Sequence, residues 1–342
     1  MKGRSRRRAG RGGRDPGGWV GGTPVEERPL HITAAAGRAA NGEVVTNMKP
    51  HPWKPILALL AAITLATPAA AKEGGDQYPV GVDGLAAGAL PPPGTYLLSM
   101  VALVHGDVQD ADGHDAGVEA NAQFGVLRLV HVTKLRVLGA QYAFGAILPY
   151  WHQSAKIRTP AGKLELDADG PGDITLNPVY LNWHLPRNLH LLATVDLNLP
   201  TGRFRTDGGL SQGVGYYSVS PAVAATWYAP GGFEASGKLL YNLKRENPVT
   251  GVRSGDELEL DFAVAKLFGP FEAGIGGYYA VQTTDDELDG QKVNAKAEGL
   301  ALGLQAAYQA PFGTFIGMWH HDVTSDSRLQ ADRVFLKFML PL

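Results

Sequence analysis

From Thr95 to the end of the chain, apolar and polar side chains alternate with a period of two. This period is typical of β-strands whose two faces meet different surroundings. In residues 256–267, for example, Leu258 and Leu260 share one face, and the acidic residues between them lie on the other. The alternation predicts a sheet with one apolar face, without saying which face points inward.

Short and long connections alternate between these strands. Tight-turn residues fill the short connections at 132–134, 186–188, 230–232, 268–270 and 310–313. Long polar loops are expected at 107–115, 151–171, 201–214, 246–254 and 284–294, with a shorter loop at 325–328. The predicted strands are 94–106, 116–131, 135–150, 172–185, 189–200, 215–228, 233–245, 255–267, 271–283, 295–309, 313–324 and 329–341. About 12 strands with short turns at one end predict an all-β fold: a transmembrane antiparallel up-and-down β-barrel with periplasmic turns and long extracellular loops.

Aromatic residues bracket the short turns, as in the girdles of membrane barrels, where rings lie between hydrocarbon and water. The group comprises Trp183, Trp227, Tyr228, Phe233, Phe268, Phe271, Tyr308, Phe312 and Phe315. A soluble β-protein with aromatic hairpin ends is the alternative. It is disfavoured because twelve long strands would enclose a cavity too wide for these apolar side chains to fill.

The charged face of each strand is expected to line the lumen, because Lys or Arg facing mid-bilayer lipid costs about 2–4 kcal/mol. The candidate lumen-lining residues are Glu119, Asn121, Gln123, His190, Asp196, Asn198, Glu234, Lys238, Glu257, Glu259, Asp261, Glu272, Arg333 and Lys337. Acids outnumber bases seven to three in this set. These residues suit either of two interiors: a narrow channel that disfavours small anions, or a polar core whose side chains pair across the lumen and seal the barrel.

The start of the chain differs in composition from the rest. Residues 1–47 carry nine Lys/Arg and four Asp/Glu without hydrophobic periodicity, which predicts a disordered basic extension. It is interpreted either as a nucleic-acid-binding arm or as the product of a mis-assigned start. Residues 48–71 combine two lysines, a short apolar run and small residues, which predicts a signal peptide cleaved after Ala71.

The chain after that site carries 20 Lys/Arg and 29 Asp/Glu, so we expect an exported acidic protein with no nucleic-acid partner. Residues 72–93 form an irregular Gly/Pro-rich lead that ends in Pro91–Pro93 and is a candidate lumen plug. Three prolines cannot lie within a central strand, since each lacks an N–H group. The barrel is therefore expected over residues 94–342.

Catalytic and metal-binding patterns are missing from the sequence. The chain has no cysteine, which excludes thiol catalysis and thiolate-bound metals. It has no GxSxG, HExxH or phosphate-loop motif, so we predict no enzymatic activity, cofactor or metal site. The DADG segments at 110–113 and 167–170 lack the remaining ligands of a calcium loop. A hydrolase assembled across several strands is a further alternative.

Several segments of the chain resemble a known family. They are EGGDQYPVGVDGLAAGALPPPGTYLL, VLGAQYAFGAILP, GPGDITLNPVYLNWH, LPTGRF and LLYNLKRENPVTGVRSGDELELDFAVA. Together they resemble the phenol meta-pathway degradation family of Gram-negative outer-membrane β-barrel proteins, and the resemblance extends from Lys72 to Leu342. It implies a barrel associated with the uptake of aromatic or other hydrophobic compounds, and it carries over no catalytic residue.

The sequence thus predicts an outer-membrane channel or transporter for passive uptake of small aromatic or hydrophobic solutes. Its expected surroundings are outer-membrane lipid and lipopolysaccharide. The alternative is a structural or surface-interaction barrel of the outer membrane with a sealed lumen.

Overall fold

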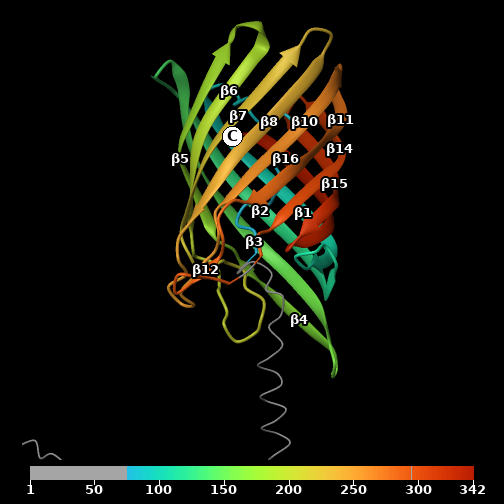
Figure 1. Cartoon of the computed structure of the whole chain (residues 1–342). Helices are drawn as coiled ribbons and strands as arrows, with labels where there is room; N and C mark the ends of the chain where they lie inside the picture. Colours follow the sequence, from blue (N-terminus) through green and yellow to red (C-terminus); the bar gives the residue numbers. More distant parts are fainter. Residues whose placement is uncertain (1–74, 294) are drawn as a thin grey trace, which may run out of the picture. The chain divides into compact units, whose positions relative to one another are not determined.

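A computed structural model describes residues 75–293 and 295–342 (Figure 1). The predicted extension at 1–47 and the predicted signal peptide at 48–71 lie outside the described residues, as do residues 72–74 of the lead. The described chain folds as a closed antiparallel barrel of twelve strands, which confirms the predicted fold class.

The barrel strands are β1 (Gly94–Gln109), β2 (Asp115–Val137), β3 (Ala140–Thr159), β5 (Ile174–Leu185), β6 (Leu189–Leu199), β7 (Ser218–Ala229), β8 (Phe233–Lys244), β10 (Glu257–Phe268), β11 (Phe271–Gln282), β14 (Glu298–Ala310), β15 (Gly313–Asp326) and β16 (Leu329–Pro341). Each strand pairs with the next along the chain, and β1 pairs with β16 from Tyr96–Pro341 to Val108–Leu329. This last pairing leaves no open edge among the twelve barrel strands, as a membrane barrel requires.

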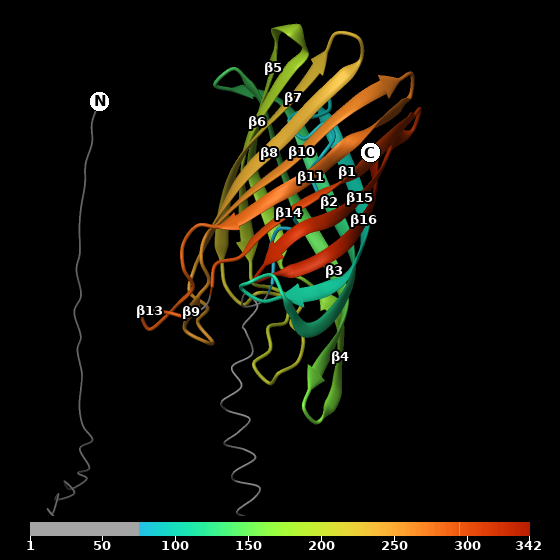
Figure 2. The ribbon, with the colours of Figure 1, turned by 45° about the vertical axis from the view of Figure 1, so that its right-hand side comes forward.

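Two predicted connections are wrong. Residues 132–134 belong to β2, which contains an irregularity between Val132 and Arg136 and continues to a turn at Leu138 and Gly139. Both turn residues have positive φ, 51° and 78°, which is the backbone of a tight hairpin turn that matches strand twist. The expected loop at 151–171 is instead a hairpin of β3 with β4 (Gly162–Pro171), visible in Figure 2 beyond the barrel end.

The other long loops carry little regular structure. Residues from two of them form a small sheet of β9 (Val252–Arg253), β12 (Glu287–Leu288) and β13 (Gln291–Lys292). A single 3-10 turn, η1 (Pro186–Asn188), joins β5 to β6. No helix within the described ranges is long and apolar enough to cross a bilayer.

The outer face of the barrel is apolar and the inner face is largely polar. On β10, Glu257, Glu259 and Asp261 are buried, whereas Val264 on the opposite face is 53% exposed. Ile275, the register partner of Val264 on β11, is 63% exposed. Exposed aliphatic side chains beside buried carboxylates are the reverse of the arrangement in a soluble protein, and they fit a barrel wall surrounded by lipid.

Substituting an outward-facing aliphatic residue tests this assignment. We expect Val264→Arg to lower the free energy of unfolding in lipid vesicles by about 2–4 kcal/mol, because the guanidinium would face hydrocarbon. Urea titrations of protein folded into phospholipid vesicles measure the change. Val249→Arg, at a 64% exposed position in the β8–β9 loop, is the control and should leave stability unchanged. Equal effects of both substitutions would contradict a lipid-facing Val264.

Candidate functional site: the barrel interior

The lead segment, residues 75–93, runs through the barrel interior. At one end the Asp76 carboxylate accepts a hydrogen bond of 2.8 Å from Arg328, in the connection between β15 and β16. At the other end the Leu90 amide donates to Asn182, 3.2 Å away and close to the turn after β5. The lead therefore extends from the end with long loops to the end with short turns, where β1 begins at Gly94.

Asp261 on β10 holds the middle of the lead. Its carboxylate accepts hydrogen bonds from the Tyr78 hydroxyl at 2.7 Å, the Gly81 amide at 2.8 Å and the Asp83 amide at 2.8 Å. Asp261 is 1% exposed, so these three donors replace the water that a carboxylate would otherwise bind. One inward carboxylate thereby fixes the local backbone of the lead.

The Asp83 side chain meets positive charge from the barrel wall. Lys238 Nζ on β8 lies 2.8 Å from its carboxylate, and Arg128 on β2 lies 3.8 Å away. Lys238 also lies 4.6 Å from the centre of the Tyr78 ring. Lys337 on β16 donates to the carbonyl of the neighbouring Val82. Basic side chains from three strands thus converge on residues 82 and 83 of the lead.

Further along the lead, Gly88 lies directly against β7. Its amide donates to Thr226 Oγ1 at 2.9 Å, and its carbonyl accepts from Asn182 Nδ2 at 2.7 Å. A Cβ at this position would lie 2.6 Å from the backbone of Ala225, closer than real Cβ contacts allow. Glycine is therefore required for the lead to fit against this wall.

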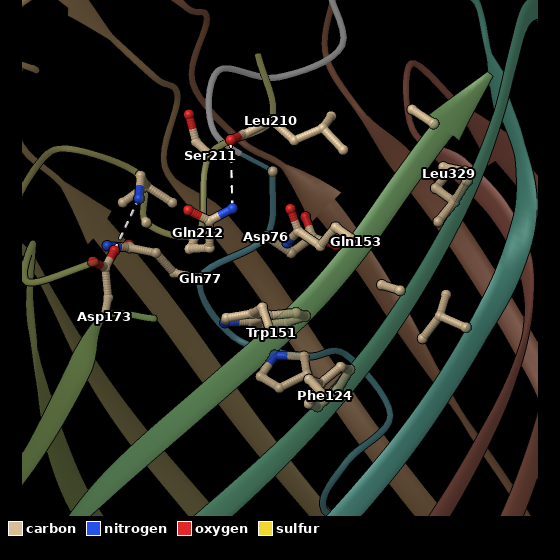
Figure 3. Close-up of a pocket in the computed structure, with 18 of the residues that line it drawn as sticks. Asp76, Gln77, Phe124, Trp151, Gln153, Asp173, Leu210, Ser211, Gln212 and Leu329 are labelled. Atoms are coloured by element: carbon tan, nitrogen blue, oxygen red, sulfur yellow. Dashed lines mark hydrogen bonds between the residues drawn. The ribbon is translucent and has the colours of Figure 1, made fainter. Parts of the chain in front are cut away.

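A cavity of about 720 Å³ lies at the long-loop end of the lumen (Figure 3). Aromatic side chains line it from the barrel wall: Phe124 on β2, Trp151 on β3 and Phe335 on β16. The Phe124 and Trp151 ring centres are 4.3 Å apart. Polar groups border the same space, among them Gln153 and Gln212, so it combines aromatic side chains of the barrel wall with amide hydrogen-bonding groups.

A second cavity of about 90 Å³ lies deeper in the lumen, next to Asp83 and Arg128. It shares Trp151, Phe124 and Pro79 with the larger cavity. The two spaces are thus neighbours between the lead and the β2–β3 wall, and this aromatic pair borders both.

Asp173, in the connection between β4 and β5, fixes the loop that covers the larger cavity. Its two carboxylate oxygens accept from the Gly202 amide at 2.8 Å and the Val214 amide at 2.9 Å. Burial raises the pKa of Asp173 above its ordinary value, against the opposing effect of these backbone donors. Residues 200–217 are held over the mouth as a consequence, although they contain no strand.

Most of the predicted lumen-lining residues are buried within the barrel. Ten have exposures of 9% or less: Asp196, Asn198, Glu234, Lys238, Glu257, Glu259, Asp261, Glu272, Arg333 and Lys337. His190 is half-buried and lies on the same face of β6 as Asp196 and Asn198.

The prediction is wrong for Glu119 and Gln123 on β2. Both alternate with the inward Phe124 and so lie on the outer face, where the Glu119 carboxylate accepts from the exposed Lys156 at 3.0 Å. Asn121, between them, borders the larger cavity. Here the inward face is apolar, because Phe124 belongs to a buried cluster that packs against Val82 of the lead. The rule that charges face inward therefore fails for Glu119.

Several buried or half-buried polar residues of the interior were not predicted. Arg128 lies between two valines of the inward face of β2, so the alternation there gives no sign of a charge. Asp322 on β15 pairs with Arg333 and accepts from the Tyr278 hydroxyl at 2.6 Å. The other omissions include Asn177, Asn182, Asn242, Lys244, Gln305 and His320.

One cluster of three potential metal ligands occurs within the described ranges, at Asp110, Asp112 and His114 in the loop after β1. Asp110 Oδ1 already accepts the amides of Asp112 and His114, at 3.0 and 2.9 Å. These bonds account for the loop conformation without an ion.

The barrel is similar to solved outer-membrane proteins. An outer-membrane channel of Pseudomonas putida F1 has 20% identity and a TM-score of 0.66, covering 74% of this chain and 97% of its own. The translocator domain of the autotransporter NalP from Neisseria meningitidis has 10% identity and a TM-score of 0.44, covering 74% and 90%. A TodX mutant, a monoaromatic hydrocarbon channel, has 11% identity and a TM-score of 0.43, covering 74% and 91%.

The Pseudomonas putida likeness supports the barrel fold. No curated protein matches the chain. Residues 105–338 match the family model described as "Putative MetA-pathway of phenol degradation", and the chain belongs to that family.

Proposed function

We propose that this protein is an outer-membrane channel for passive uptake of small hydrophobic compounds, aromatic ones among them. The observation that carries the proposal is the cavity of about 720 Å³ at the long-loop end, with Phe124, Trp151 and Phe335 in its wall. Membership of the phenol-degradation family supports it, as does the likeness to a Pseudomonas putida protein described as an outer-membrane channel.

The chemistry of the cavity suits such a solute. Aromatic walls offer ring stacking and a surface from which water is easily displaced, while Gln153 and Gln212 can bond a hydroxyl or carbonyl group. A solute would move from this cavity toward the smaller one along the β2–β3 wall. No residue in this account transfers protons or electrons, so we propose transport and not catalysis.

The lead is proposed to act as a plug that restricts the remaining lumen. Its support is the series of contacts from Asp76 to Leu90, with Asp83 held by Lys238 and Arg128 at the centre. A narrow route would pass small solutes between the lead and the wall and exclude larger polar ones.

The same lead also supports a second function, a structural or surface-interaction barrel with a sealed lumen. The observation in its favour is the density of lead-to-wall bonds around Asp261 and Asp83. Whole-cell uptake of a radiolabelled monoaromatic compound by a Gram-negative host separates the two functions. Uptake no faster than in cells without the protein would refute the channel and favour the sealed barrel.

We further propose export through a signal peptide cleaved after Ala71, and contact with lipopolysaccharide at the long-loop end. The second proposal is supported by exposed ion pairs on the outer face of β2 and β3: Lys156 with Glu119, and Arg158 with Asp115. Alternating exposed charges of both signs suit a layer of phosphates and bridging divalent cations.

Trp151 provides a direct test of the uptake route. We expect Trp151→Ala to weaken binding of a small aromatic solute by about 2–10-fold, because aromatic pairs contribute about 0.5–1.5 kcal/mol. Equilibrium dialysis of the solute against purified protein, together with whole-cell uptake, measures the change. Tyr150→Ala is the matched control, since Tyr150 is the adjacent aromatic residue on the outer face. Equal behaviour of the two variants would place the route elsewhere.

Asp83 tests the plug. Asp83→Asn removes the carboxylate that pairs with Lys238 and Arg128, and loss of one partner of a buried pair costs about 3–5 kcal/mol. We expect amide exchange of the lead to accelerate by about 100-fold or more, with increased ion conductance in planar bilayers. Asp107→Asn, at an exposed position of β1, is the control. Unchanged exchange and conductance would contradict a plug held by Asp83.

A further inference from the structure

Two histidines meet at the short-turn end of the lumen. His184, at the end of β5, is the register partner of His190, at the start of β6. Their Nδ1 atoms are 2.6 Å apart, and their ring centres are 4.8 Å apart with an interplanar angle of 79°. Both continue inward faces of their strands: His184 follows the buried Asn182, and His190 precedes the buried Leu192.

The short contact between like nitrogens restricts where the ring hydrogens lie. Only one Nδ1 can carry the hydrogen, and the other must present its lone pair. His184 Nε2 lies 3.3 Å from Gln141 Oε1, which can accept a hydrogen from it. With the ring hydrogen of His184 on Nε2, its Nδ1 lone pair accepts from His190 Nδ1–H. The amide of Gln141 orients this ring as the outer partners of metal-bound histidines do.

The space between the two nitrogens suits a metal ion. Copper and zinc bind imidazole nitrogen at about 2.0–2.1 Å, which would place two ligating nitrogens roughly 3 Å apart. The present separation of 2.6 Å reaches that value by small side-chain rotations once the bridging hydrogen has left. The paired strands hold both Cα atoms in place, so little conformational entropy is lost on binding.

The surroundings of the two histidines also suit metal binding by neutral imidazole rings. Neither imidazole forms an ion pair with a carboxylate in the part of the chain that the structure describes. The ring of Tyr228 on β7 packs edge to face with His190, at 5.6 Å between centres. His184 is exposed and His190 is half-buried, so an ion has access from the mouth of the barrel.

We propose that His184 and His190 together bind one divalent transition-metal ion at the short-turn mouth of the barrel. Imidazole pairs favour copper, nickel and zinc over calcium or magnesium, and Cu²⁺ binds most tightly in this series. The ion replaces the hydrogen between the rings, and that proton leaves to solvent. It joins β5 to β6 two residues from Asn182, which holds Gly88 and Leu90 of the lead.

The test uses the purified full chain in detergent without a histidine tag, titrated with Cu²⁺. Calorimetry is expected to show one tight equivalent, with nitrogen couplings from two imidazoles in the electron paramagnetic resonance spectrum. Binding should be lost in His184→Gln and in His190→Gln. Gln141→Leu, which removes the orienting amide, should weaken it roughly 10–100-fold.

His114→Gln is the matched control, because Asp110, Asp112 and His114 form the competing cluster. The proposal would be overturned if His114→Gln no longer bound one Cu²⁺ ion tightly. It would also be overturned if His184→Gln and His190→Gln both still bound that ion. Histidine modification by diethyl pyrocarbonate gives an independent measurement on the unaltered chain, without relying on variants that fail to fold. Cu²⁺ should protect His184 and His190 at least tenfold, and equal modification with and without the ion would also refute the site.

Discussion

The structure depends on one constraint: every backbone N–H and C=O group of a wall surrounded by hydrocarbon must be bonded within the wall. The pairing of β1 with β16 meets this constraint, because it joins the first and last strands and removes both edges of the sheet. Closure then separates two environments. Aliphatic side chains such as Val264 and Ile275 face outward, and carboxylates such as Glu257 and Asp261 are enclosed.

Enclosure creates a second requirement, since buried charges need partners. The lead supplies many of them: its backbone amides satisfy Asp261, and its Asp83 carboxylate meets Lys238 and Arg128. It also supplies apolar contact where the wall is apolar, as Val82 does beside Phe124. The lead and the inner face of the barrel are thus complementary in both charge and hydrophobicity, and the cavities are the spaces that this match leaves open.

The sequence predicts the barrel well because strand period and turn residues are local properties. It misplaces the turn at 132–134, where the hairpin continues to Leu138, and it misses the β3–β4 hairpin. The interior is harder to predict, since it depends on which distant segments meet. The charge of Glu119 wrongly predicts an inward position, and Arg128 gives no signal because it lies between two valines. Which inward positions are polar depends on the groups of the lead that contact them. The cavity with Trp151 depends on the loop fixed by Asp173, which no local pattern reveals.

The direction of the lead has a consequence for biogenesis. Gly94 starts β1 at the short-turn mouth, while Asp76 contacts Arg328 beside the opposite mouth. A segment threaded through a finished cylinder in this way would have to be pulled along its whole length past Gly88, which has no space to spare against β7. The lead is therefore expected to lie against the growing sheet before β16 reaches β1. Closure of the barrel then traps the lead, and the order of assembly is set by the topology of the chain.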